Sequence, residues 1–177
     1  MNLRLQTVMN LKLHTHRVNL KQALVLTFLG VLMYVSQVIM SQLPNIELVS
    51  LLTIFIARKF GLKSLVSVYI FVGCEILTYG LSMWVVNYLY IWAILALVVC
   101  LVRKIDSQIL YTLISGVFGL LFGILCSVPY FFIGGFAYGI ANIVSGLGFD
   151  MIHGVGNIVL TFLLYKPVTK VLEKAIK

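Results

Sequence analysis

Long apolar runs, separated by short stretches that carry almost all of the charge, constrain the fold of this chain more than any other feature. Of its 177 residues, 62% are hydrophobic and only 10% are charged. Soluble domains have about 45–50% apolar and about 25% charged residues, so a soluble fold would leave much apolar surface in water. We therefore expect one compact all-α integral membrane protein, because a membrane-spanning helix needs about 20 mainly apolar residues.

Six apolar runs are candidates for membrane-spanning helices. The second run is the shortest, and its boundaries are the least defined. The connector between the last two runs, residues 127–148, is rich in glycine and aromatic residues and has room for a short re-entrant or interfacial helix. The six expected spans are Ala23–Met40, Glu47–Ala57, Ser64–Leu81, Val86–Val102, Ser107–Cys126 and Phe149–Val168.

All thirteen Lys and Arg residues fall on one side of this six-span arrangement, and the other three connections contain none. Because cytoplasmic loops carry the excess of Lys and Arg, we expect both termini in the cytoplasm. Residues 1–22 then form a cytoplasmic N-terminal segment, and residues 23–177 form the membrane domain. The net charge of +8 is thus a topology signal, and no nucleic-acid partner is expected. The cations are Arg4, Lys12, Arg17, Lys21, Arg58, Lys59, Lys63, Arg103, Lys104, Lys166, Lys170, Lys174 and Lys177.

Several polar residues lie inside or at the start of apolar runs. Glu75 lies within the third run, where a carboxylate is costly and indicates a functional site, unless a protonated Glu75 bonds to a neighbouring helix. Asp150, His153 and Asn157 fall on one helix face at the start of the last run. Asp150 also suits an N-cap, and His153 also suits a packing position or a metal ligand.

Aromatic residues gather at the expected outer side. The stretch "MWVVNYLYIW" supplies Trp84, Asn87 and Tyr88. A membrane-interface belt explains some of them, but aromatic walls with a few polar groups also suit a flat polar ligand. The absence of Lys and Arg there favours a neutral or cationic heterocycle. The expected site residues are Asn45, Glu47, Glu75, Trp84, Asn87, Tyr88, Asp150, His153 and Asn157.

Sequence motifs of common enzymes are missing. The chain has no phosphate-binding loop of the G-x-x-x-x-G-K-[ST] type, no H-E-x-x-H and no G-x-S-x-G. We therefore expect a binding protein rather than an enzyme, without a metal or cofactor of its own.

Three segments carry a resemblance to a known family. They are "LPNIELVSLLTIFIARKFG" (Leu43–Gly61), "YIWAILAL" (Tyr90–Leu97) and "GFDMIHGVGNIVLTFLLYKPV" (Gly148–Val168). With the length and span count, they resemble the substrate-binding (S) component of energy-coupling factor (ECF) transporters, which are bacterial vitamin importers. The resemblance implies a multi-pass protein of the bacterial plasma membrane that captures a vitamin or precursor outside and topples to release it inside. It implies as partners a transmembrane coupling subunit and two ATP-binding-cassette ATPases, which use the ATP.

The resemblance also implies a docking surface for the coupling subunit. The first helix of the family usually carries an alanine-x-x-x-alanine patch, and the matching stretch here is "ALVLTFLG". Ala23, Thr27 and Gly30 are the implied docking residues, with ordinary packing inside the bundle as the alternative.

Three other functions remain open from the sequence. A metal-dependent intramembrane enzyme would need Glu75, Asp150 and His153 to converge within about 4–5 Å. A stand-alone permease would need no ATPase partner. A structural membrane subunit would need no ligand and no outer pocket.

Overall fold

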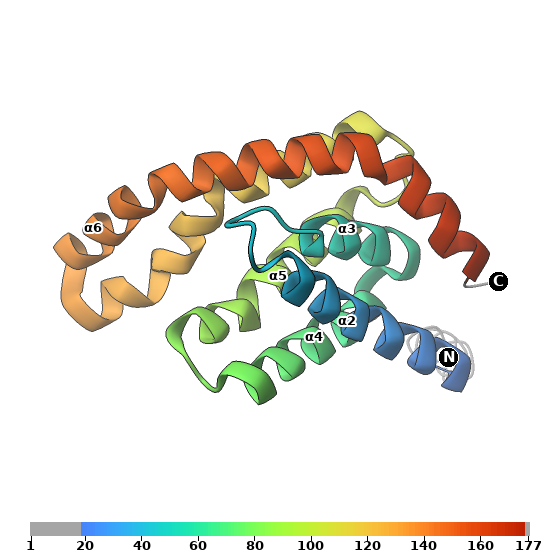
Figure 1. Ribbon diagram of the computed structural model, residues 1–177, viewed down its shortest axis with the longest axis horizontal. Helices are drawn as coiled ribbons and strands as arrows, with labels where there is room; N and C mark the ends of the chain where they lie inside the picture. The colour runs from blue at the N-terminus through green and yellow to red at the C-terminus, as the bar shows by residue number, and fades with distance from the viewer. Residues whose placement is uncertain (1–18, 176–177) are drawn as a thin grey trace, which may run out of the picture.

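The computed structural model of the protein describes residues 19–175, and all of its regular secondary structure is helical (Figure 1). Within this part, four helical runs are long and apolar enough to cross a membrane: Leu20–Met40, Val49–Tyr79, Met83–Val102 and Gln108–Ala175. The prediction of an all-α, multi-pass membrane protein is thereby confirmed, whereas six separate spans are not shown. Of the predicted cytoplasmic segment 1–22, only the last four residues belong to the described part.

Helices α2 (Leu20–Met40) and α4 (Ser64–Tyr79) pack closely against each other. α2 begins at Asn19, whose side chain accepts a hydrogen bond from the backbone N of Gln22 at 2.8 Å. At the contact with α4, a Cβ added to Gly30 would lie 2.6 Å from the carbonyl oxygen of Ser67. Small residues therefore bring these two backbones together, as is typical of membrane helices.

Helix α3 (Val49–Phe60) is the central helix of the bundle. All nine residues from Val49 to Ala57 are buried, so every face of the helix is covered by other parts of the chain. A helix in this position needs no polar face, which explains its nearly uniform apolar sequence. Gly61, with φ of +61°, ends it, and the short 3-10 helix η1 (Gly61–Lys63) leads into α4.

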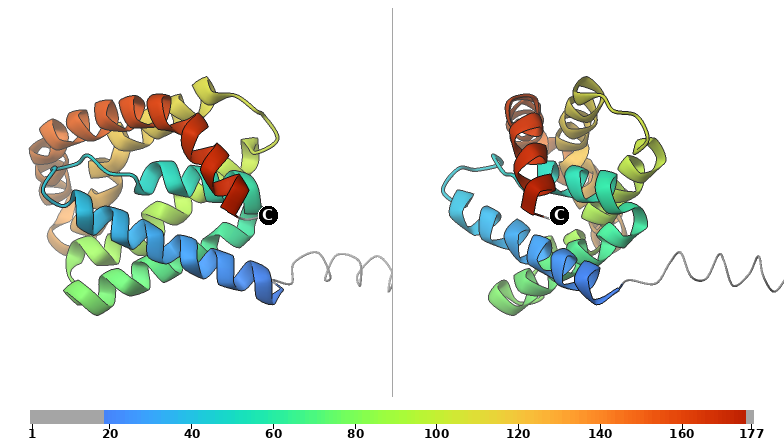
Figure 2. Two further views of the ribbon diagram at one scale, coloured as in Figure 1. Left: turned by 45° about the vertical axis from the view of Figure 1, so that its right-hand side comes forward. Right: turned by 90° about the vertical axis from the view of Figure 1, so that its right-hand side faces the viewer.

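Helix α6 (Gln108–Ala175) is helical over 68 residues except at Gly135, and it folds back on itself (Figure 2). The two arms contact each other where Gly119 meets Gly154 and where Thr161 Oγ1 lies 2.9 Å from Ser115 Oγ. The residues between the arms form the bend, so the connector proposed as a re-entrant or interfacial segment is helical here. Helix α5 (Met83–Val102) packs against α3, α4 and α6.

The segments that carry the cations meet at one end of the molecule. Lys63 Nζ donates to Gln22 at 2.9 Å, and Arg58 donates to Tyr165 at 2.6 Å and to Asp106 at 2.5 Å. These contacts join the beginning of α2, the α3–α4 turn, the α5–α6 loop and the end of α6, which lie on the right in Figure 1. The remaining connections lie toward the other end.

Candidate ligand-binding site

A cavity of about 170 Å³ lies beneath the loop that joins α2 to α3. Loop residues cover it, and side chains of α2, α5 and both arms of α6 form its walls. Figure 1 shows this loop beside the returning arm of α6, away from the cationic end. The lining residues are Gln37, Met40, Ser41, Leu43, Pro44, Asn45, Ile46, Glu47, Tyr88, Trp92, Phe122 and His153.

Glu47 fastens the covering loop to the rest of the molecule. One of its carboxylate oxygens lies 3.1 Å from His153 Nε2 on α6, and the other accepts from the backbone N of Ser50 at 2.9 Å. The side chains of Glu47 and His153 are only 12% and 4% exposed. Asn45 adopts a positive φ of +58°, a conformation that asparagine tolerates well. The loop is therefore held over the cavity by polar contacts at defined positions.

Tyr88 is the centre of the aromatic wall. Its ring lies 5.3 Å from that of Trp84, 5.5 Å from that of Trp92 and 6.4 Å from that of Phe122. Its hydroxyl lies 3.5 Å from Gln37 Nε2. Aromatic side chains in edge-to-face contact form a rigid wall with few polar atoms, which suits a flat ring.

Two residues that line the cavity carry a ring nitrogen with no hydrogen-bond partner among the described residues. They are Trp92 Nε1 and His153 Nδ1, and the two side chains are almost completely buried. If His153 donates its Nε2 proton to Glu47, its Nδ1 is an acceptor, whereas the indole nitrogen of Trp92 is always a donor. A buried polar atom without a partner costs about 1–3 kcal/mol. A ligand that reached these two nitrogens would find one donor and one acceptor.

Four of the nine predicted site residues line this cavity, namely Asn45, Glu47, Tyr88 and His153. Trp84 contacts Tyr88 from outside, is 39% exposed and is not part of the wall.

Three other predicted residues bond between helices. Asn87 donates to a backbone carbonyl of α6 at 3.1 Å. Asp150 accepts from the backbone N of Gly123 at 2.8 Å and lies within helical backbone, not at an N-cap. Asn157 donates to Ser50 Oγ at 3.1 Å and to a carbonyl of the other α6 arm. In this structure these side chains hold the walls in place and do not line the cavity.

Glu75 is fully buried on α4 and does not line the cavity. Neither of its carboxylate oxygens has a hydrogen-bond partner in the described part of the chain, so the predicted bond to a neighbouring helix is not formed. Within residues 19–175, no three His, Cys, Asp or Glu side chains gather as a metal site would require. The convergence that the intramembrane metalloenzyme needs is therefore missing from this part.

The predicted site residues leave out most of the cavity wall, including Gln37, Trp92 and Phe122. Trp92 follows Tyr88 by four residues on α5, so it lies on the same helix face and this spacing could have identified it. No signal marks Phe122, because it is one apolar residue among many on a helix that is apolar on all faces.

The three implied docking residues on α2 differ in their surroundings. Thr27 is exposed and Ala23 is partly exposed, so both are open to a partner. Gly30 is buried against α4, which is the ordinary packing role considered as the alternative for this stretch.

Comparison of the chain with protein-family models, with curated proteins and with solved structures finds no match. The functional interpretation therefore depends on the cavity and on the sequence segments described above.

Proposed function

We propose that this protein captures a small polar molecule in the cavity beneath the α2–α3 loop and serves as the substrate-binding component of an ECF-type importer. The observation that carries this proposal is the cavity itself, with an aromatic wall and two buried ring nitrogens that have no partner among the described residues.

The volume of the cavity favours a single-ring ligand. A cavity of about 150 Å³ inside a protein is large enough to hold benzene. The cavity here is only slightly larger, at about 170 Å³, so a bicyclic compound would extend beyond it. One aromatic ring with a few polar substituents is therefore the preferred ligand.

The chemistry of the wall favours a ring that both accepts and donates hydrogen bonds. Trp92 would donate to a ring nitrogen or carbonyl, and His153 would accept from an amino group or ring N–H. Glu47 is the one acidic side chain of the wall, and no Lys or Arg lines it. A neutral or cationic heterocycle, such as a pyrimidine or thiazole vitamin precursor, meets these requirements.

We further infer that α3, α4 and the two arms of α6 each cross the membrane, giving six spans. The 12 residues of α3 extend only about 18 Å at 1.5 Å per residue, short of a hydrocarbon core of about 30 Å. The covering loop would complete this crossing, because irregular backbone is tolerated in a membrane where it lines a cavity. The cationic end would face the cytoplasm and the cavity would open outward.

In this proposal the energy for uptake comes from partners. A transmembrane coupling subunit and two ATP-binding-cassette ATPases would drive release on the cytoplasmic side. Ala23 and Thr27, on the open face of α2, are the docking residues that remain available to such a subunit.

An uptake assay tests this function. Cells that express the chain alone, or together with the coupling subunit and ATPases of its own organism, receive radiolabelled vitamins and single-ring precursors. We expect accumulation of one compound only when active ATPases are present. Tyr88→Phe should weaken uptake, whereas Tyr79→Phe, at an exposed tyrosine outside the cavity, should not. Equal uptake by the chain alone would instead indicate a stand-alone permease.

A further inference from the structure

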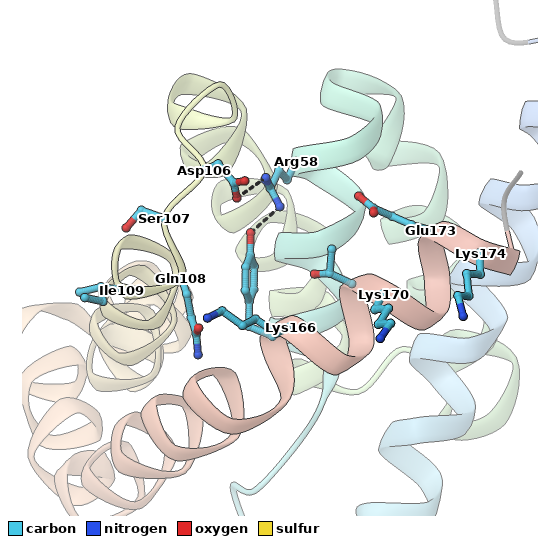
Figure 3. Close-up of a pocket in the computed structure, with 11 residues that line it drawn as sticks. Arg58, Asp106, Ser107, Gln108, Ile109, Lys166, Lys170, Glu173 and Lys174 are labelled. Atoms are coloured by element: carbon cyan, nitrogen blue, oxygen red, sulfur yellow. Dashed lines mark hydrogen bonds and ion pairs between the residues drawn. The ribbon is translucent and has the colours of Figure 1, made fainter.

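A second cavity, of about 730 Å³, opens at the cationic end of the molecule, far from the cavity beneath the α2–α3 loop (Figure 3). It lies between the α5–α6 loop, the start of α6 and the last turns of α6. Four cationic and two acidic side chains line it, so its net charge is +2. The lining residues are Arg58, Asp106, Ser107, Gln108, Ile109, Tyr165, Lys166, Thr169, Lys170, Glu173 and Lys174.

Three lysines form one wall of this cavity. Lys166, Lys170 and Lys174 follow each other at intervals of four residues, so they share one face of α6 and repel one another. No ion pair joins any of them to a carboxylate in the described part of the chain. Acidic residues on the same face of a helix usually offset the repulsion between its cations. Here a bound anion would reduce the repulsion between the three lysines.

Arg58 forms a fixed wall opposite the lysines. It donates to Tyr165 and pairs with Asp106, and its guanidinium lies 5.6 Å from the ring centre of Tyr111 and 5.7 Å from that of Tyr165. The Arg58 pair neutralises Asp106, so Glu173 is the one acid that still opposes the lysines within the cavity.

The beginning of α6 adds a further positive element to the same cavity. Ser107, Gln108 and Ile109 line it. The first backbone N–H groups of a helix have no intrahelical acceptor, and here the N–H of Leu110 bonds to Ser107 Oγ at 3.3 Å, which leaves the N–H groups of Gln108 and Ile109. These N–H groups, with the positive end of the helix dipole, favour an anion. The lysines and the beginning of α6 therefore both favour an anion in this cavity, from different sides.

We propose that this cavity binds a phosphate-bearing anion and that its ligand is the headgroup of an anionic phospholipid. The cavity lies where long apolar helices end, which in the proposed membrane topology is the level of the lipid headgroups. Next to its rim, Ile109, Phe162 and Leu163 are exposed, and they offer an apolar surface to acyl chains. Basic pockets between membrane helices are suited to such headgroups. The proposal does not depend on whether the first cavity binds a ligand.

Lipid binding to the full-length protein in detergent, followed by native mass spectrometry, tests the proposal. The probes are phosphatidylglycerol, phosphatidylcholine as the lipid without net charge, and inorganic phosphate. The double variant Lys166→Gln/Lys170→Gln is compared with Lys59→Gln/Lys104→Gln, which removes the same charge at the same end but outside the cavity. At about 1 kcal/mol for each lysine, the cavity variant should bind phosphatidylglycerol roughly 30-fold more weakly, and the control less than about 3-fold.

Three results would overturn the proposal. An equal loss in both variants would indicate general attraction to the cationic end, and equal binding of both lipids would exclude headgroup recognition. Competition by inorganic phosphate at the same concentration as the lipid would assign the cavity to a free anion. If thermal unfolding shows that the double variant is misfolded, Lys170→Gln alone should still weaken phosphatidylglycerol binding about 5-fold.

Discussion

The contact between the two arms of α6 predicts that Gly119→Ala destabilises the protein. A Cβ at Gly119 would lie 2.8 Å from Cα and N of Gly154 and from the carbonyl carbon of His153. Carbon atoms prefer about 3.5–4.0 Å, so the arms would have to separate by roughly 0.7 Å or more. All three atoms belong to backbone, and no side chain can rotate away to make room.

The magnitude follows from two opposing contributions. Overpacking costs about 1–3 kcal/mol, whereas replacing glycine by alanine inside a helix stabilises by about 0.5–1 kcal/mol. Gly73→Ala on α4 is the matched control, because beyond its own helix backbone and chain neighbours no atom lies within 4 Å of its added Cβ. The control gains the helix contribution without the clash, so the difference between the two variants isolates the cost of packing, about 1–3 kcal/mol.

Thermal unfolding of both variants in the same detergent measures this difference. For a chain of this length, 1 kcal/mol corresponds to about 2–4 °C in the unfolding midpoint. We expect Gly73→Ala to melt at or slightly above the wild-type temperature and Gly119→Ala several degrees below it. If Gly119→Ala melted as high as Gly73→Ala, the close approach of the two arms would be wrong.

Three further predictions concern charged side chains. Glu47→Ala removes the contact with His153 and the hydrogen bond from the backbone N of Ser50. The variant should lose about 1–3 kcal/mol of stability. Limited digestion should then cleave the α2–α3 loop faster than in the wild type. Arg58→Ala should destabilise the protein, and Arg58→Lys should not restore the lost stability. A lysine cannot pair with Asp106 and bond to Tyr165 while its charged group also lies over the rings of Tyr111 and Tyr165. Equal melting temperatures of Arg58→Lys and wild type would contradict this. Glu75→Gln should leave the unliganded protein as stable or more stable, since the amide cannot carry the charge whose burial is costly; a clear fall in melting temperature would contradict this.

The membrane class and the helix runs followed from the sequence because both have a direct physical cause. A chain that is 62% hydrophobic with clustered cations has few other solutions, and glycines with positive φ end α3 and α4. The pairing of Glu47 with His153 could also have been predicted from the sequence. Both residues start apolar runs on the uncharged side, so one end of the bundle brings them together.

The inward faces of the helices could not be predicted in the same way. A helix in lipid is apolar toward the membrane and toward its neighbours, so periodicity does not distinguish the cavity face from the lipid face. Phe122 was missed for this reason. Polar residues such as Asn87 and Asn157 are ambiguous as well, because an amide that binds a ligand and one that joins two helices look alike in a sequence.

The central claim, that the cavity beneath the α2–α3 loop binds a single-ring polar ligand, is tested most directly by fluorescence of Trp92. Trp84→Phe removes the tryptophan outside the cavity and leaves Trp92, in its wall, as the one reporter. Titration of this variant with vitamins and single-ring precursors should give a saturable change with one compound. His153→Ala in the same background should weaken that binding at least about 10-fold, while Tyr79→Phe should leave it unchanged. No response to any single-ring compound, or an equal response in the His153→Ala variant, would contradict the assignment of this cavity as the binding site.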